Sequence, residues 1–342
     1  MRSFACGHCG QLLFFENTLC LRCRTPCGFV PEQLELVTLE GDAALGLLHC
    51  ANRALAECNW MVGARGDLCR SCRLTRVRPG DTDRAGMAAF ATAEAAKRRA
   101  IFQLLDLGLP GVTDETPEFH LLSSVAGRVT TGHADGVITI DLAESDDARR
   151  EARRAQLGEP YRTILGHFRH ELGHYYQPLL MTSDAEWEAC RALFGDEREE
   201  YGAALERHYE QGAPDDWTRR YVSAYATMHP WEDWAETFAH YLHIRDTLQT
   251  AAEFGIHVTG PRGAELDPAL IAAPRHDAGE IGFREMLDDW LPLTYALNAV
   301  NRSMGRDDLY PFTLPGAVVD TLAVVHARVR AAAPPVTSAA RQ

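Results

Sequence analysis

The residues of this chain best suited to chemistry are two histidines and a glutamate within five positions, His170-Glu171-Leu172-Gly173-His174. Side chains four positions apart lie on one face of an α-helix, so both imidazoles can bind a single ion. The adjacent Glu171 then points toward a water on that ion, where it can act as a general base. The pattern predicts a zinc site with hydrolytic chemistry, and such a site needs a third protein ligand.

The third ligand is predicted on a second helix, within residues 229–243. A metzincin would have glycine at position 177 and histidine at position 180, but this chain has Gln177 and Leu180, which excludes that class. Glu232 and Glu236 lie four positions apart on one helix face. One glutamate can bind the ion while the other holds a ligand histidine through its second ring nitrogen. The residues alone leave open which glutamate has which role.

Further histidines lie close to both motifs. His167 is three positions before His170, and we expect it to support or cap the site, because a fourth imidazole would fill the position that water needs. His229, His240 and His243 are additional candidates. In the alternative interpretation, the two glutamates are simply solvated residues of an amphipathic helix.

Cysteines are crowded at the N-terminus, with nine of the ten within the first 72 residues. Cytosolic thiols stay reduced, so clustered cysteines there indicate metal ligands rather than disulfides. Cys6, Cys9, Cys20 and Cys23 form two C-x-x-C pairs at zinc-ribbon spacing. The pattern predicts a structural zinc site, although a rubredoxin-like iron site would use the same ligands.

A second group of cysteines is more widely spaced and comprises Cys50, Cys58, Cys69 and Cys72. It predicts a second structural zinc ion, with buried, unliganded cysteines as the alternative. Cys27 is left over and could compete for a place in the first group. Sites closed by four protein ligands support folding rather than chemistry, so we expect this head to be structural or to bind a protein partner.

Composition narrows the class of protein. A length of 342 residues exceeds the ~250–300 residues at which single cores stop growing, so more than one folding unit is expected. A net charge of −14 argues against a chain-wide nucleic-acid or membrane binder, and we interpret the arginines at 70, 73, 76 and 78 as a solvated rim. No apolar run approaches the ~18 residues of a membrane span, and cysteines occupy the place of a signal peptide's apolar segment. We therefore expect a cytoplasmic protein.

The elements that must position these residues change in type along the chain. A turn-rich stretch at 78–83 predicts a cysteine-rich head at 1–80, followed by a body at 84–332 and a disordered tail at 333–342. Short strands are predicted at 119–123 and 137–142. Helical patterns are predicted at 87–107, 146–155, 161–177, 184–193, 197–209, 231–250, 282–300 and 315–332. A few strands followed by many helices predict an α+β body.

Two stretches of the chain carry a resemblance to known metal sites. The H-E-x-x-H motif followed by Glu232-x-x-x-Glu236 resembles the gluzincin arrangement, and Glu-Asp-Trp-Ala-Glu-Thr-Phe at 232–238 resembles the second metal helix of the anthrax lethal factor type. The resemblance implies that Glu232 binds zinc, and that Glu236 lies outside the set of ligands and supports it. It also implies that Tyr225, seven residues before the ligand glutamate, contacts the metal site.

Over nearly its full length the chain also resembles bacterial zinc-binding metallopeptidases that have an N-terminal zinc ribbon. The cysteine pairs and His-Pro-Trp-Glu-Asp-Trp-Ala-Glu at 229–236 are the most specific parts. The resemblance implies a zincin-like metallopeptidase domain that acts on a peptide or protein substrate, with one catalytic and two structural zinc ions. It implies no particular substrate.

These expectations define a mechanism and a competing hypothesis. In the mechanism, Glu171 accepts the proton of a zinc-activated water and Tyr225 donates a hydrogen bond to the developing oxyanion. The strand at 137–142 is the predicted sheet edge on which an extended substrate would lie. In the alternative, the protein is a zinc-ribbon adaptor that binds a protein or nucleic-acid partner and has a catalytically inactive body.

Overall fold

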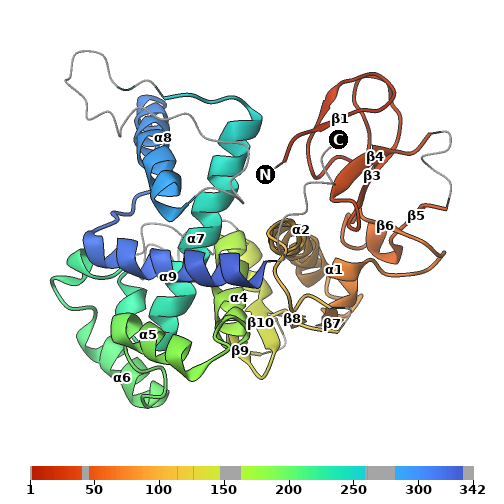
Figure 1. Cartoon of the computed structure of the whole chain (residues 1–342). Coiled ribbons are helices and arrows are strands. Elements are labelled where there is room, and N and C mark those ends of the chain that lie inside the picture. The colour runs from red at the N-terminus through yellow and green to blue at the C-terminus, as the bar shows by residue number, and fades with distance from the viewer. Residues whose placement is uncertain are drawn as a thin grey trace.

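The structure is a computed structural model that describes residues 2–40, 46–113, 115–125, 127–146, 163–258, 260 and 282–333. A head of short strands lies beside a mostly helical body with a small sheet (Figure 1). This is the α+β arrangement expected from the sequence. The helix predicted at 146–155 and the tail predicted at 333–342 lie outside the described residues, apart from the first residue of each.

The described residues of the head form three two-stranded antiparallel ladders followed by one helical turn. The ladders pair β1 (Phe4–Ala5) with β2 (Leu12–Leu13), β3 (Cys27–Val30) with β4 (Glu35–Thr38), and β5 (Leu48–His49) with β6 (Met61–Val62). The helical turn is α1 (Arg70–Arg73). Isolated pairs of such short strands are marginally stable in water, so the head needs additional stabilisation, which bound metal can supply.

The body contains a four-stranded sheet with the order β7-β8-β10-β9. Its strands are β7 (Thr75–Val77), β8 (Glu118–Leu122), β9 (Gly132–Ala134) and β10 (Val137–Asp141). β8 pairs in parallel with β7 and β10, whereas β9 runs antiparallel to β10. Alternate residues of β8 and β10 are fully buried, as the period of two in a strand requires: Phe119, Leu121, Ile138 and Ile140.

The prediction that residues 137–142 form a sheet edge is wrong. β10 is an inner strand, because the chain turns back at Asp135 and Gly136 and β9 takes the edge position. Both turn residues have positive φ, 49° and 81°, as a tight two-residue hairpin turn requires. β9 has only three residues and no apolar alternation, so its sequence does not indicate a strand.

Helices make up most of the described part of the body. In chain order they are α2 (Arg84–Asp106), α4 (Ile164–Leu180), α5 (Asp184–Phe194), α6 (Tyr201–Gln211), α7 (Pro230–Glu253), α8 (Phe283–Ser303) and α9 (Gly316–Ala332). Most agree with the predicted ranges to within a few residues. α6 begins later than the predicted residue 197, because Glu197 lies in a loop and pairs with Arg191 of α5, and the Glu200 side chain caps the helix.

The two helices that carry the metal-binding motifs, α4 and α7, pack directly against each other. Gly173 faces Ala235, and a Cβ on Gly173 would lie 2.8 Å from the Ala235 Cα, closer than real side chains approach. The indole N–H of Trp234 donates to the Gly173 carbonyl oxygen over 2.9 Å. The missing side chain of glycine therefore permits a close helix crossing at the centre of the H-E-x-x-H motif.

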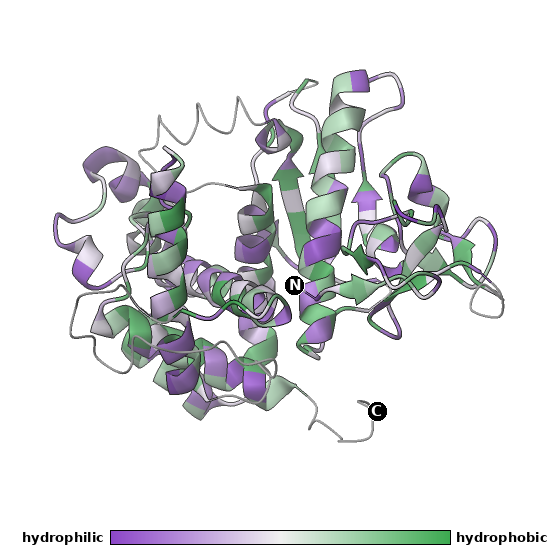
Figure 2. Cartoon of the chain, turned by 90° about the horizontal axis from the view of Figure 1, so that it is seen from above, coloured by the Kyte–Doolittle hydropathy of each residue, from purple (hydrophilic) through white to green (hydrophobic). Residues whose placement is uncertain are grey.

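The head and the body are in contact on both sides of the predicted boundary. β7 precedes this boundary, yet it is an edge strand of the body's sheet. Phe102 of α2 packs against Phe15 and Phe29 of the head, with ring centroids 4.8 and 5.3 Å apart. Seen from above, the head lies along one side of the body (Figure 2), and one apolar core runs through the described residues of both parts.

Candidate metal centre

Three side chains predicted as ligands converge between α4 and α7. The Nε2 of His170 lies 3.2 Å from the Nε2 of His174 and 2.9 Å from the Oε2 of Glu232. The Nε2 of His174 lies 3.4 Å from that same oxygen, and all three residues are buried. A tetrahedral zinc ion with bonds of about 2.0–2.1 Å would hold its ligands about 3.3–3.4 Å apart. The spacing of these donor atoms therefore fits zinc.

The orientation of the Glu232 carboxylate favours an ion over a hydrogen-bonded cluster. Its Oε1 accepts a hydrogen bond from the Tyr201 hydroxyl over 2.9 Å. Its Oε2 is buried and lies 2.9 and 3.4 Å from the Nε2 atoms of His170 and His174, but its angles to them do not satisfy a hydrogen bond. A buried charge is costly unless it is well paired and hydrogen-bonded. A cation shared with the two imidazoles would reduce that cost.

Glu236 lies behind His170 and outside the group of converging donor atoms. Its Oε1 is 2.7 Å from the His170 Nδ1, the ring nitrogen that does not face Glu232. Its Oε2 accepts a hydrogen bond from the Ser223 hydroxyl over 2.5 Å. A carboxylate at Nδ1 sets the tautomer and the orientation of the ring, so that Nε2 is free to bind an ion. The geometry thus gives Glu232 and Glu236 different positions, which the residues alone do not distinguish.

Glu171 lies beside the same centre with a carboxylate that has few partners. Its Oε2 is buried and makes no hydrogen bond within the described part of the chain. Burial raises the pKa of Glu171 to about 7, while the charge of His170 lowers it and the charges of Glu232 and Glu236 raise it further. A carboxyl group with a pKa near neutrality can both accept and release a proton at physiological pH.

Two tyrosines adjoin the ligand side chains. The ring of Tyr225 lies 5.9 Å from the ring of His170. Burial and the charge of Glu232 raise the pKa of both tyrosines, so both remain neutral phenols. Tyr201 and Ser223 are the site residues that sequence reasoning missed. Neither belongs to a spaced motif, and no signal in the sequence relates them to the helix that begins at residue 230.

The remaining candidate histidines lie outside the group of converging donors. The Nδ1 of His167 is 3.9 Å from a carboxylate oxygen of Glu144. His229 caps α7, because its Nδ1 accepts a backbone N–H of the first turn over 3.1 Å. His240 hydrogen-bonds a buried tyrosine hydroxyl over 2.8 Å, and His243 packs its ring among aromatic residues. None of these four imidazoles reaches the point where the three donor atoms meet.

The eight predicted cysteine ligands form two clusters in the head. One cluster brings together Cys6, Cys9, Cys20 and Cys23, and the other Cys50, Cys58, Cys69 and Cys72, with the sulfurs of each set within 4.8 Å of one another. Sulfur–sulfur distances of 3.6 Å in the first and 3.7 Å in the second agree with the edge of about 3.8 Å of a tetrahedron with zinc–sulfur bonds of about 2.3 Å. Cys27 lies buried in β3, outside both clusters.

Charged side chains of α2 face the second cysteine cluster. Glu94 and Lys97 are fully buried and form an ion pair at 2.7 Å, and the other Glu94 oxygen lies 3.8 Å from the Cys72 sulfur. The nearby Arg98 is also buried, and its charge favours the thiolate form of Cys58. Four thiolates around a divalent cation carry a net charge of −2, so buried cations beside them reduce the cost of burying the cluster. The cluster therefore connects the head to a helix of the body.

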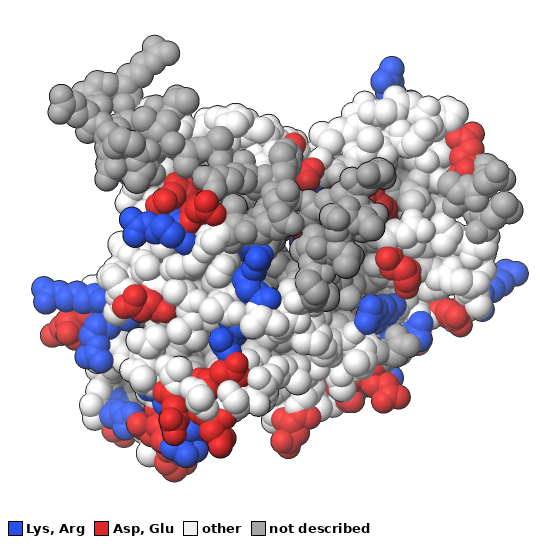
Figure 3. Space-filling model, in the orientation of Figure 1, with Lys and Arg blue, Asp and Glu red and all other residues white. Residues whose placement is uncertain are grey.

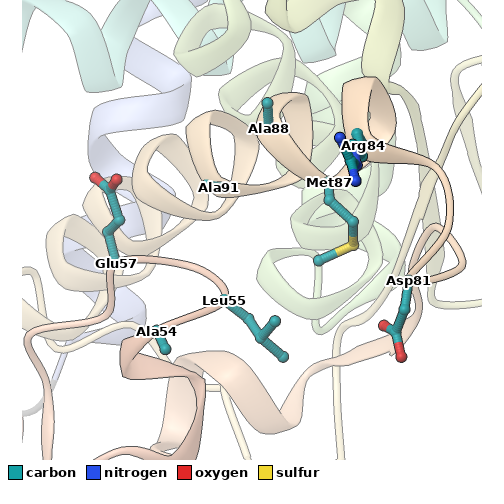
Figure 4. A pocket seen from close by; sticks show the side chains of 8 residues that line it. All are labelled: Ala54, Leu55, Glu57, Asp81, Arg84, Met87, Ala88 and Ala91. Atoms are coloured by element: carbon teal, nitrogen blue, oxygen red, sulfur yellow. The ribbon is translucent and has the colours of Figure 1, made fainter.

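Two cavities lie beside the head, away from the three converging ligands. One of about 430 Å³ lies between residues 54–57 and the start of α2, with Leu55 and Met87 facing each other across it (Figure 4). The other, of about 680 Å³, is lined by apolar strand residues together with Arg70 and Arg73. On the face shown in Figure 3, acidic and basic side chains are interspersed, most densely around α5 and α6. No described helix is long and apolar enough to cross a membrane.

Comparisons with known proteins agree with both parts of this description. Residues 86–328 match a family described as putative zinc-binding metallo-peptidase, and residues 3–83 match a zinc-ribbon domain. Proteins from Mycobacterium bovis and two strains of Mycobacterium tuberculosis, each named as uncharacterized, are 51% identical over 98% of this chain and 97% of their own. No solved structure matches the chain significantly.

The first of these matches covers well over half of the chain. The protein therefore belongs to the family of putative zinc-binding metallo-peptidases, and it carries an N-terminal zinc-ribbon domain.

Proposed function

We propose that this protein hydrolyses peptide bonds, with one zinc ion held by His170, His174 and Glu232. The observation that carries the proposal is the convergence of their three donor atoms beside the buried, unpaired oxygen of Glu171. Zinc bound there would act as a Lewis acid that lowers the pKa of a water and polarises the substrate carbonyl. A set of three protein ligands leaves the coordination open for that chemistry.

Glu171 acts in this proposal as the general base and then as the general acid. Its carboxylate takes a proton from the attacking water and delivers it to the leaving amine nitrogen. Burial raises the pKa of Glu171 and a bound cation would lower it again, so the carboxyl group would be ionised when the site holds zinc. Burial keeps the carboxylate away from bulk water, so its free oxygen is available to a water in the site.

Tyr225 donates a hydrogen bond to the oxygen of the substrate carbonyl as negative charge develops on it. The neutral state of its phenol and the position of its ring next to His170 support this role. A donor already held at the place where charge develops needs no reorganisation during the reaction.

An extended substrate pairs with β9 in this proposal. β9 has β10 on one side only, so its other edge is open to an added strand within the described sheet. The ring of His133, in the middle of β9, lies 6.4 Å from the ring of His174. A peptide along this strand would therefore pass close to the ligand histidines.

The two four-cysteine clusters hold structural zinc ions in this proposal. Their sulfur spacing and the match to a zinc-ribbon domain support zinc, and four protein ligands leave no position for an activated water. The full chain would then hold three zinc ions.

Glu171→Gln tests the mechanism. The variant keeps the size and polarity of the side chain but lacks the base, so we expect an intact fold, the parent's zinc content and a loss of about 10²–10⁴-fold in cleavage. Cleavage is measured as new amino termini in a mixture of unstructured peptides of varied sequence. The matched control is Glu188→Gln, an exposed glutamate of α5, which should cleave like the parent. Undiminished cleavage by Glu171→Gln would exclude the proposed mechanism.

A further inference from the structure

Tyr201 contacts the proposed centre, although it lies in neither metal-binding motif. It is the first residue of α6, and its hydroxyl donates to the Oε1 of Glu232 over 2.9 Å. The Tyr201 proton is therefore engaged by the carboxylate.

The bond from Tyr201 determines how Glu232 can bind an ion. A carboxylate can bind through one oxygen or through both. With Oε1 engaged by Tyr201, only Oε2 is available to an ion, and this is the oxygen that faces the two histidine nitrogens. The tyrosine thus favours a single-oxygen ligand and keeps the coordination open for water and substrate.

The position of Tyr201 is itself well supported. Its ring packs against His229 and Trp231 at the start of α7, with centroids 5.3 and 5.9 Å apart. The loop before it is held by the two-pronged ion pair between Arg191 and Glu197, with contacts of 2.6 and 3.0 Å. These contacts anchor the N-terminus of α6 to the N-terminus of α7, so Tyr201 meets Glu232 at a defined place.

From this geometry we propose that Tyr201 is a positioning residue, which holds the third zinc ligand, Glu232, to one oxygen. The proposal rests on the proposed zinc site between α4 and α7. It gives α6 a role in the metal centre, although both metal-binding motifs lie on other helices, α4 and α7.

Tyr201→Phe tests the proposal, because it removes the hydroxyl and keeps the ring packing. The first readout is the affinity of the open site for zinc, measured by chelator competition on the full chain. The zinc ion of the open site is identified as the one that is absent from His174→Ala. We expect Tyr201→Phe to weaken this affinity by about 10–100-fold, as is typical when an outer partner of a metal ligand is lost. We expect Tyr225→Phe to keep the parent's affinity and to lose cleavage only.

The second readout is the visible absorption of cobalt in the open site, taken as the difference between the parent and His174→Ala. A carboxylate freed to bind through both oxygens raises the coordination number, so the bands of Tyr201→Phe should become weaker. Tyr295→Phe is the matched control, since this tyrosine of α8 is 62% exposed. It should leave both readouts unchanged.

The outcomes separate this proposal from the proposed function. If the parent and His174→Ala hold the same amount of zinc, there is no open zinc site and the proposed function itself fails. If the parent holds the additional ion but Tyr201→Phe binds it equally tightly with the same cobalt spectrum, the positioning role of Tyr201 is refuted while the function stands. A loss of zinc from the cysteine clusters together with a lower melting temperature would also refute it, since that pattern indicates general unfolding.

Discussion

Gly173 of α4 and Ala235 of α7 touch so closely that the two helices have no space for a side chain between them. A Cβ on Gly173 would lie 2.8 Å from the Ala235 Cα and 3.0 Å from its carbonyl oxygen. One position after Gly173 comes the ligand candidate His174, and three positions before Ala235 comes Glu232. The contact therefore sets the distance between the imidazoles and the carboxylate.

Gly173→Ala should damage the proposed metal centre as well as the stability of the fold. The added methyl group meets backbone atoms, which cannot move aside as a side chain can, so the helices must separate. We expect a loss of about 1–3 kcal/mol in the free energy of unfolding, typical of overpacking, and weaker zinc binding at the open site. Urea unfolding and chelator competition measure the two effects.

Gly316→Ala is the control for this substitution. Gly316 is also helical, but a Cβ there would meet no atom within 4 Å. This variant should be as stable as the parent or slightly more so, because alanine favours the helix. If both variants behaved alike, the close contact between α4 and α7 would not determine the geometry of the centre.

The two glutamates of α7 should differ in their effects on zinc. Glu232→Ala removes a proposed ligand and should abolish zinc binding at the open site. Glu236→Ala removes only the partner of the His170 Nδ1, so we expect a weakening of about 10–100-fold. Ser223→Ala, which leaves Glu236 in place, should have a smaller effect. Zinc content and chelator competition rank the three variants by their loss of zinc affinity. A larger loss in Glu236→Ala than in Glu232→Ala would mean that Glu236 is the ligand and Glu232 its support.

The cysteine clusters should bind zinc independently of catalysis. Cys20→Ser should lower the zinc content from three ions to two per chain and destabilise the head, since its short strands depend on the metal. Cys27→Ala, next to the first cluster but outside it, should retain three ions. Metal analysis by mass spectrometry distinguishes the two variants. A loss of zinc from Cys27→Ala would place Cys27 among the ligands.

Acid should destabilise the fold partly through buried, uncharged histidines. Burial lowers the pKa of His326 to about 4, with contributions from Arg245 and Arg330, whereas an unfolded histidine titrates at about 6.5. Between these values the unfolded state binds more protons, so the free energy of unfolding falls as the pH drops below 6.5. For His326 alone we expect a loss of about 2 kcal/mol at pH 5.

Urea unfolding at pH 7.5 and pH 5 measures this effect. His326→Gln should lose less stability than the parent over that interval, because glutamine does not titrate. His257→Gln, at an exposed histidine, is the control and should show the parent's dependence. An equal loss in the parent and His326→Gln would assign the acid sensitivity to other groups.

The features that depend on neighbouring residues could be predicted from the sequence. The H-E-x-x-H motif, the paired glutamates and the C-x-x-C pairs each place their ligands within one or two turns of chain, so spacing alone indicates what can share an ion. Most helices of the body were predictable for the same reason, because their apolar faces repeat along a single segment. The resemblance to zinc-binding metallopeptidases was also carried by these local patterns.

Only the tertiary structure decided the relationships between segments. Among the described strands, β9 rather than β10 is the open edge of the sheet, because a turn places a three-residue strand outside β10. Glu232 and Glu236 took different positions because α4 crosses α7 at Gly173, so one carboxylate meets the ligand nitrogens and the other meets the far side of a ring. Tyr201 reaches Glu232 from 31 residues earlier in the chain. Such contacts depend on how separate helices pack, which has no periodic signal in the sequence.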